Sequence, residues 1–355
     1  MANPNGKLLV EVKELQVHFF LYEGIVRAVD GVSFSINEGQ TLGVIGESGS
    51  GKSVTAQSIL GIVPSPPARQ IGGDILLYQN NASGGRDVTN LSKLHRTGPE
   101  YRALRGKEIG IIFQEPMTSF SPLHSIGNQI MESILLHIPG VTKAEAKERA
   151  IEMLRRVGIP KPERQVDAYP HQFSGGMRQR AMIAMALSCN PRLLIADEPT
   201  TALDVTIEAQ ILDLLQSLKE ELGMAILYIS HDLAVVGGVA DEVMVMYMGM
   251  VMEHASAAEI FDSPLHPYTK ALWRSIPKID GPLDALIPIA GSVPSPFAQH
   301  RGCPFYSRCV ERIPDVCDAA LPPVVEASPR HKVRCFLYTD NRPSTPHLLQ
   351  ETRRG

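Results

Sequence analysis

One eight-residue stretch, residues 46–53 (GESGSGKS), combines three glycines with a lysine and a hydroxyl in the pattern G-x-x-x-x-G-K-S/T. The glycines let the backbone wrap around an anion with its N–H groups pointing at phosphates. Lys52 supplies a cation for the β/γ-phosphates and Ser53 a hydroxyl for Mg²⁺. We therefore predict a nucleoside triphosphate site. Its expected contacts are Gly46, Glu47, Ser48, Gly49, Ser50, Gly51, Lys52, Ser53 and Val54.

The segments around this loop are those that the motif requires. Residues 40–45 (QTLGVI) form a short apolar run typical of a buried parallel strand, and residues 54–63 have helical apolar spacing. The alternative is a glycine-rich turn that fits by chance. A strand before the loop and a helix after it favour phosphate binding.

Two acidic residues, Asp197 and Glu198, come at the end of a second buried strand, residues 192–197 (RLLIAD). A strand beside the phosphate loop would bring Asp197 to the Mg²⁺. Glu198 would then orient or deprotonate the water that attacks the γ-phosphate. An acidic loop after any buried strand is the alternative, and the phosphate loop favours the catalytic interpretation.

Two further polar residues end predicted strands. Gln114 follows the strand at 109–113 and could reach Mg²⁺ or the water, although an exposed loop glutamine is an equal alternative. His231 follows the strand at 224–229 and could hydrogen-bond the γ-phosphate. A histidine that merely starts the next helix is the alternative.

A glycine pair opens an apolar helix in residues 173–180 (FSGGMRQR). Ser174 could be an ordinary N-cap, but two glycines at a helix start suit close approach of an anion. Asp204 could likewise be only the N-cap of the helix that begins at Val205.

Composition and pattern set the wider organisation. The 355 residues predict one large domain with an appendage, and a net charge of −4 argues against a general nucleic-acid binder. Strands alternating with helices predict an α/β fold, with strands at 8–19 and 26–36 and a hairpin and loop at 71–105. Residues 121–187 form a helical insertion, in which Thr142 and Glu145 make a capping box.

Neither a signal peptide nor an apolar run of spanning length is expected, so we predict a cytosolic location with reduced cysteines. A Pro-rich shift near Asp262 predicts a domain boundary.

Taken in order, GESGSGKS, Gln114, FSGGMRQR, RLLIADEP, TALD and His231 resemble the full motif set of ATP-binding-cassette (ABC) ATPases over roughly residues 8–260. The resemblance implies a P-loop NTPase domain at 1–260, with a RecA-like parallel sheet, an antiparallel β subdomain and a helical subdomain at about 115–188. It implies ATP and Mg²⁺ as ligands. The implied catalytic residues are Glu198, His231 and Gln114, and the implied Mg²⁺ contacts are Ser53, Gln114 and Asp197.

The resemblance also implies that the signature of one subunit closes on the ATP held by another. The residues in question are Ser174, Gly175, Gly176, Met177 and the D-loop residue Asp204, and Met177 stands where the commonest signature has Gln. Phe19 aligns best with the adenine-stacking aromatic, with Tyr22 as the second choice.

The last part of the chain resembles the C-terminal extension of oligopeptide/dipeptide permease ATPases, through HPYTKAL (266–272), IPIAGSVPSP (287–296) and GCPFYSRC (302–309). This implies an ATP-hydrolysing subunit of a peptide importer, peripheral on the cytoplasmic face of the membrane. Its partners would be a related second ATPase in a heterodimer, two membrane subunits and, indirectly, an external binding protein.

Other functions stay open at this point. The same machinery could import nickel chelates or oligosaccharides. A soluble ABC ATPase acting on nucleic acid or ribosomes is disfavoured, because such proteins carry two cassettes or a long coiled-coil insertion. A scaffold without turnover is disfavoured by intact Glu198 and His231.

Four cysteines gather in residues 261–340, which we expect to form a small irregular domain followed by a flexible tail at 341–355. Their spacing lacks a C-x₂-C pair, and the resemblance implies a [4Fe–4S] cluster at Cys303, Cys309, Cys317 and Cys335. Zinc, with His300 or His331 as substitute ligands, and four free thiols are the alternatives. Because these cysteines are far from Lys52 in sequence, we expect their role to be structural.

Overall fold

The computed structural model describes residues 6–81, 84–114, 119–201, 204–275, 289–298 and 301–339. Its largest element is an eight-stranded sheet of order β11-β12-β10-β9-β3-β8-β7-β6. The five strands from β9 to β6 are parallel, and nearly all of their residues are buried because helices or the second sheet cover both faces. These are β3 (Thr41–Ile45), β6 (Ile109–Ile112), β7 (Leu193–Asp197), β8 (Ala225–Ile229) and β9 (Glu242–Tyr247).

The strands at one edge of this sheet, beyond β9, pair antiparallel. β10 (Met250–Ser256) returns beside β9, and the C-terminal hairpin of β11 (Val324–Ser328) and β12 (His331–Arg334) adds to β10. The cysteine-containing end of the chain therefore shares a sheet with the ATPase-like part.

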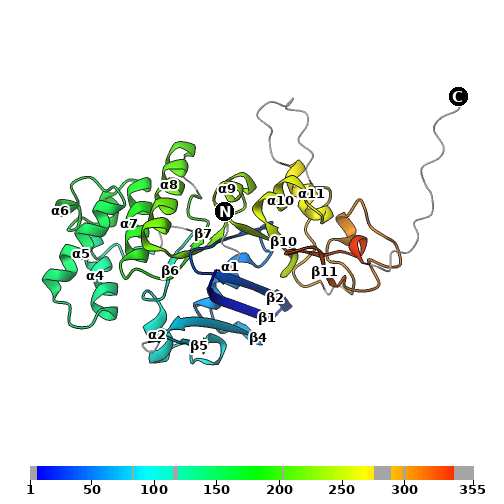
Figure 1. Cartoon of the computed structure of the whole chain (residues 1–355), viewed down its shortest axis with the longest axis horizontal. Helices are drawn as coiled ribbons and strands as arrows, with labels where there is room; N and C mark the ends of the chain where they lie inside the picture. Colours follow the sequence, from blue (N-terminus) through cyan, green and yellow to red (C-terminus); the bar gives the residue numbers. More distant parts are fainter. Residues whose placement is uncertain are drawn as a thin grey trace.

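A second, antiparallel sheet of order β2-β1-β4-β5 packs below the first (Figure 1). Its strands alternate buried and exposed side chains, as expected for a sheet with one face in a core. The strands are β1 (Leu8–Leu21), β2 (Gly24–Asn37), β4 (Ala68–Asn80) and β5 (Arg86–Asn90).

The helices divide into two groups. One end of the molecule is a helical block of α4 (Ile126–His137), α5 (Lys143–Arg156), α6 (Pro162–Gln165) and α7 (Gly175–Leu187) (Figure 1). The other helices connect or cover strands: α1 (Lys52–Ile59), α2 (Pro99–Leu104), α8 (Val205–Leu222), α9 (Leu233–Val239), α10 (Ala257–Asp262) and α11 (Pro267–Arg274). The capping box of Thr142 and Glu145 is present at α5. The predicted α/β fold class is confirmed.

Some local expectations were incomplete. The stretch expected as a hairpin and loop, residues 71–105, contributes a third and a fourth strand to the antiparallel sheet and ends in helix α2. Residues 261–340, predicted to be irregular because they are Pro-rich, contain helix α11 and the β11–β12 hairpin. The predicted division at residue 260, the helical subdomain limits and the 341–355 tail stay predictions, and that tail lies outside the described residues.

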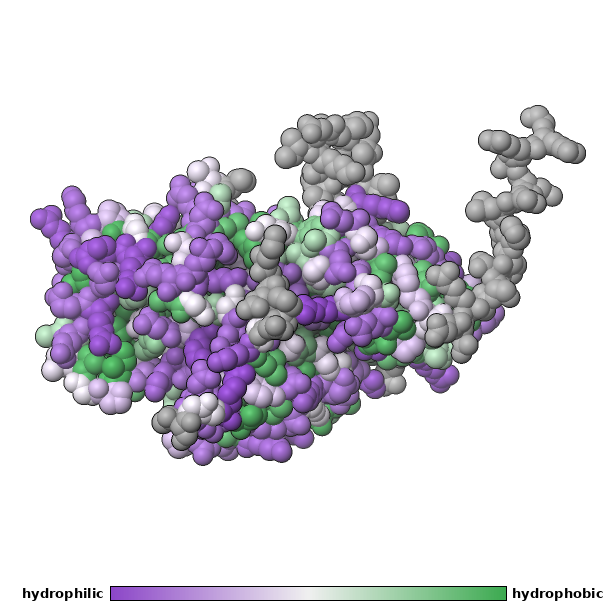
Figure 2. All heavy atoms as spheres, in the orientation of Figure 1, coloured by the Kyte–Doolittle hydropathy of each residue, from purple (hydrophilic) through white to green (hydrophobic). Residues whose placement is uncertain are grey.

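The outer surface is mixed. Figure 2 shows mostly hydrophilic side chains on the face drawn, with hydrophobic side chains in small separate areas. None of the helices in the described ranges is both long and apolar enough to cross a membrane.

Candidate functional site

The phosphate loop joins β3 to α1 at the carboxyl end of the parallel sheet. Its backbone requires glycine at two positions: Gly51 has φ +100°, and Gly46 has φ +152°. A Cβ on Gly46 would lie 2.2 Å from the carbonyl oxygen of Met246, and one on Gly51 2.2 Å from that of Ala28. The loop is therefore pressed against neighbouring backbone, which only glycine permits.

Lys52 lies inside this loop. Its Nζ donates to the carbonyl oxygens of Gly46 at 2.7 Å and Glu47 at 3.2 Å, and the residue is buried. Burial lowers the pKa of Lys52, and the negative charges of Glu198, Asp197 and Glu47 oppose that shift. An anion entering the loop would therefore meet a desolvated cation.

Ser53 and Asp197, 144 residues apart in the chain, are in contact. Ser53 Oγ donates to Asp197 Oδ1 at 2.9 Å. Burial raises the pKa of Asp197, while the Ser53 hydrogen bond and the charge of Lys52 pull it down. A hydroxyl and a buried carboxylate beside a phosphate loop are the hard oxygen donors that fit Mg²⁺.

Glu198 collects three polar side chains at a single atom, Oε2. Gln114 Nε2 donates to it at 2.9 Å, Thr201 Oγ1 donates to it at 2.9 Å, and His231 Nδ1 lies 3.2 Å away. The backbone of Glu198 is left-handed, with φ +49°, a conformation that is uncommon outside glycine. The end of β7 thus turns this carboxylate towards the residues that follow β6 and β8.

Sequence reasoning missed Thr201. The signal was available, because Thr200 and Thr201 follow the acidic pair after Pro199 and a hydroxyl three residues beyond Glu198 can bond back to its carboxylate. The Gln114 amide donates to Glu198, and its expected contact with Mg²⁺ or the attacking water stays a prediction.

Sequence comparison bears directly on this arrangement. The family model described as "ABC transporter" matches residues 29–201, and that described as "Oligopeptide/dipeptide transporter, C-terminal region" matches residues 252–317. A probable peptide ABC transporter ATP-binding protein, y4tR of Sinorhizobium fredii, is 47% identical and covers 94% of this chain and 96% of its own. The oligopeptide transport ATP-binding protein OppD of Escherichia coli is 44% identical, covering 95% of each chain.

The chain belongs to the ATP-binding subunits of ABC transporters.

A solved relative supports the same family. The ATP-binding cassette MJ0796, whose dimeric structure is described as a post-hydrolysis state bound to ADP and Pi, superposes with a TM-score of 0.60 at 27% identity. That match covers 70% of this chain and 99% of the other. The family assignment makes the chain an ABC-type ATPase.

The residues predicted as the family signature lie at the start of α7, on the helical block. Ser174 caps the helix by accepting from the N–H of Met177 at 3.3 Å, and Gly175 is exposed with open space around it. Within the described residues, no hydrogen bond joins Ser174 to Lys52 or Glu198. Asp204 caps α8 by accepting from the N–H of Ile207 at 2.9 Å. Both N-cap interpretations hold, and the ABC signature role stays a prediction.

The two candidates for adenine stacking differ in exposure. Phe19 lies in β1, half-buried against the smaller core, whereas Tyr22 lies fully exposed in the turn between β1 and β2. The D-loop residues 202–203 lie outside the described part of the chain.

The four C-terminal cysteines come together. Cys303, Cys309, Cys317 and Cys335 all line one small cavity of about 10 Å³, enough for roughly a single water. Burial, aided by the neighbouring thiols, raises the pKa of Cys303 to about 12 and those of Cys309 and Cys335 to about 11. All five cysteines of the chain are free thiols.

A metal site is nevertheless not supported by this geometry. Among the described residues, no group of three or more His, Cys, Asp or Glu side chains is arranged to hold a metal ion. His331, a possible zinc ligand from sequence, instead lies buried 2.7 Å from the Glu253 carboxylate. His300 lies outside the described residues.

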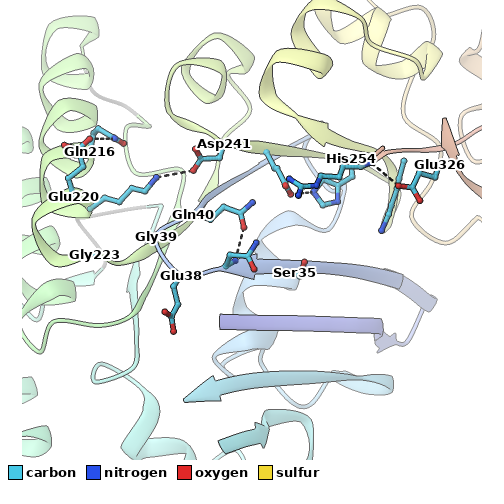
Figure 3. A pocket seen from close by; sticks show the side chains of 15 residues that line it. Ser35, Glu38, Gly39, Gln40, Gln216, Glu220, Gly223, Asp241, His254 and Glu326 are labelled. Carbon is cyan, nitrogen blue, oxygen red and sulfur yellow. Dashed lines mark hydrogen bonds and ion pairs between the residues drawn. The ribbon is translucent and has the colours of Figure 1, made fainter. Parts of the chain in front are cut away.

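One cavity lies away from the ATP site. About 720 Å³ in volume, it lies where the parallel strands begin, at the sheet edge opposite the phosphate loop (Figure 3). Its charges are largely paired within its wall: Lys219 with Asp241 at 3.2 Å, and His254 with Glu242 at 3.2 Å. The chemistry belongs instead at the phosphate loop, because Lys52, Asp197 and Glu198 converge there.

Proposed function

We propose that this chain is the ATP-hydrolysing subunit of an importer for dipeptides or oligopeptides. The observation that carries the proposal is the convergence of Gln114, Thr201 and His231 on Glu198, next to a phosphate loop and a Ser53–Asp197 pair. The peptide cargo is supported by relatives that carry peptide-transport names over nearly the full chain.

Each residue has a distinct part in hydrolysis. The loop N–H groups and Lys52 would bind the phosphates, and Ser53 and Asp197 would hold Mg²⁺, which would offset negative charge on the phosphate oxygens. Glu198 accepts a proton from the attacking water or orients it. Gln114, Thr201 and His231 fix the direction of the Glu198 carboxylate and so keep its basic oxygen in place.

The position of the predicted signature bears on which subunits this chain works with. Ser174 and its glycines lie on the helical block, where Ser174 caps α7, and this position supports a role on ATP held by another subunit. We propose a related ATPase as that subunit, two membrane subunits and an external binding protein, with this chain on the cytoplasmic face of the membrane. No nucleic-acid partner is proposed.

The test uses the whole transporter in vesicles with its binding protein. Addition of peptide should raise ATP hydrolysis severalfold, and Lys52→Ala should abolish that increase. Stimulation by a nickel chelate or an oligosaccharide but not by any peptide would overturn the cargo. A rate of ATP hydrolysis that is the same with and without the membrane subunits would contradict the proposed role in transport.

We propose separately, from the chemistry of the donor residues, that Cys303, Cys309, Cys317 and Cys335 hold an iron–sulfur cluster, although these four thiols are not arranged as a preformed metal site. Its basis is the donor set, four desolvated thiols around one space, since thiolates are the ligands of such clusters. Metal analysis of protein purified without oxygen decides between iron with sulfide, zinc and neither. Zinc without iron would indicate a structural zinc site and contradict the cluster. The absence of both metals would indicate four free thiols.

A further inference from the structure

Glu47, the second residue of the phosphate loop, is held by side chains from the C-terminal extension, by which we mean the described residues between 261 and 339. Its carboxylate accepts two hydrogen bonds from Arg308, at 2.6 Å from Nη1 and 3.0 Å from Nη2. Its N–H donates to the hydroxyl of Tyr268 at 2.9 Å. Its carbonyl accepts from Lys52, the phosphate-binding cation, at 3.2 Å. All polar groups of this one residue are therefore engaged.

Arg308 is built into place for this contact. Its side chain is only 4% exposed, Nε donates to Ala290 O at 3.1 Å, and Nη1 also reaches Tyr247 OH at 3.3 Å. The guanidinium lies 5.8 Å from the ring centre of Tyr247 and 5.9 Å from that of Phe305. The guanidinium of Arg308 therefore has little freedom to leave Glu47, because two aromatic rings lie near it and its Nε is hydrogen-bonded.

The remaining partner, Tyr268, belongs to the same packed unit. The rings of Tyr247, Tyr268 and Phe305 are mutually in contact, with centroid separations of 4.7, 5.3 and 5.5 Å. Tyr247 ends β9, whereas Tyr268 lies on α11 and Phe305 precedes Arg308 in the extension. This aromatic group fastens the extension to the strand beside the phosphate loop.

We propose that Arg308 and Tyr268 are positioning residues for the phosphate loop, so that nucleotide affinity at Lys52 requires the C-terminal extension of the same chain. The inference rests on the proposed function, since it deepens the account of the same ATP site. It assigns the extension a role within the ATPase chain besides any role of its cysteines.

Two physical effects give this proposal a distinctive signature. First, fixing the loop beforehand lowers the entropy lost when nucleotide binds. Second, Arg308 neutralises a carboxylate that otherwise stands beside the site for a polyanion. Removing Arg308 alone leaves that negative charge unpaired, whereas removing Glu47 alone does not. The two substitutions should therefore be non-additive, with the second repairing the first.

The experiment measures Mg–ATP affinity of the full-length chain for Arg308→Gln, Glu47→Gln and the double variant. We expect Arg308→Gln to weaken binding about tenfold or more, Glu47→Gln about threefold, and the double variant to return close to Glu47→Gln. Tyr268→Phe should cost about threefold, and Arg308→Lys should lie between wild type and Arg308→Gln. Arg312→Gln, an exposed arginine of the same segment, is the matched control and should bind as wild type.

Fluorescence of Trp273, the single tryptophan of the chain, reports whether the extension is folded in each variant, because it lies on α11. Arg308→Gln affinity within twofold of wild type, or a double variant weaker than Arg308→Gln, would overturn the inference. If Arg308→Gln does not fold, the other two variants decide. Weaker Mg–ATP binding by Glu47→Gln and Tyr268→Phe supports the inference, and unchanged or tighter binding overturns it. Wild-type protein that fails to bind Mg–ATP would contradict the proposed function instead.

Discussion

Single side chains carry the chemistry, and Glu198 is the one on which most contacts converge. Its Oε2 is bonded by Gln114 and Thr201 and lies beside His231, and its side chain is 14% exposed. Asp197, one residue earlier, accepts a hydrogen bond from Ser53. Neighbouring carboxylates at one strand end thus have different hydrogen-bond partners, which agrees with the separate metal-binding and water-activating roles proposed for them.

Glu198→Gln should keep ATP binding and lower the steady-state ATPase of the assembled complex by about 100-fold or more, because an amide cannot take the proton of the water. The matched control is Glu220→Gln, at the opposite edge of the sheet, which should hydrolyse as wild type. Activity of Glu198→Gln within about threefold of wild type, equal to ~0.7 kcal/mol in barrier, would remove Glu198 from its role.

Ser53→Ala should raise the Mg²⁺ concentration needed for half-maximal ATPase by about tenfold, since it removes one oxygen ligand and the hydrogen bond that orients Asp197. A Mg²⁺ titration at saturating ATP measures this. Ser58→Ala removes a hydroxyl from the same helix, where it bonds Val54 O, and should leave the titration unchanged. An unaltered Mg²⁺ requirement in Ser53→Ala would contradict the site.

At the scale of elements, β10, α11 and β12 are joined by a buried carboxylate. Glu253 on β10 is fully buried and accepts from the N–H groups of Leu265 and His266, at 2.7 and 2.9 Å, and lies 2.7 Å from His331 of β12. Burial alone would raise the pKa of Glu253, but these hydrogen bonds outweigh it and lower that pKa. The extension is therefore fastened by a satisfied buried charge.

The folded state should lose stability in mild acid because His266 becomes protonated on unfolding. Burial lowers the pKa of His266 from 6.5 to about 4, opposed by Glu253 and assisted by Lys270. The folded state thus disfavours the protonated ring, so stability is complete above pH 6.5 and falls as the pH drops towards 4. Between pH 7.5 and 5 the loss should be about 2 kcal/mol. Glu253, with its lowered pKa, contributes its own loss only at more acidic pH.

Urea unfolding followed by Trp273 fluorescence measures that loss, because Trp273 Nε1 bonds Ile260 O at 2.9 Å and reports the α10–α11 region. His266→Asn keeps an N-cap for α11 without a titrating ring and should remove the contribution of His266, leaving those of His18 and His137, whose pKa values burial also lowers. His124→Asn, an exposed histidine, should retain it. Equal pH dependence in His266→Asn and wild type would refute the assignment.

At the scale of the whole molecule, we propose that a second subunit completes the ATP site. The signature at Ser174 and the phosphate loop lie on different parts of the fold, α7 of the helical block and the β3–α1 turn. The related cassette MJ0796 is known as a dimer with ADP and Pi. Two such chains arranged head to tail would complete each site with the other's signature.

Ser174→Arg should therefore impair hydrolysis of the ATP held by the partner subunit while leaving ATP binding at Lys52 intact. A bulky cation at the signature blocks close approach to the partner's phosphates. Site-specific nucleotide trapping in the mixed pair measures it, with Ser263→Arg, an exposed serine outside the helical block, as the control. A defect confined to the site of the mutated chain would contradict the head-to-tail arrangement.

The residues of the ATP site could be predicted from sequence because each is tied to a local signal. A phosphate loop needs glycines at fixed spacing, and the polar residues Gln114, Asp197 and His231 come where buried apolar runs end. Parallel strands bring such ends to one sheet edge, so their proximity follows from the α/β pattern itself. The Thr142 capping box and the apolar stripe of α8 are local in the same way.

Only the tertiary structure decided what joins distant segments. Sequence separation suggested that the thiol-bearing segment was remote from Lys52, yet Arg308, next to Cys309, bonds Glu47 across 261 residues. The same is true of His331, which pairs with Glu253 rather than serving as a free ligand. Such contacts depend on how the C-terminal hairpin adds to β10, and no periodicity or motif in one segment records the partner that folding places against it.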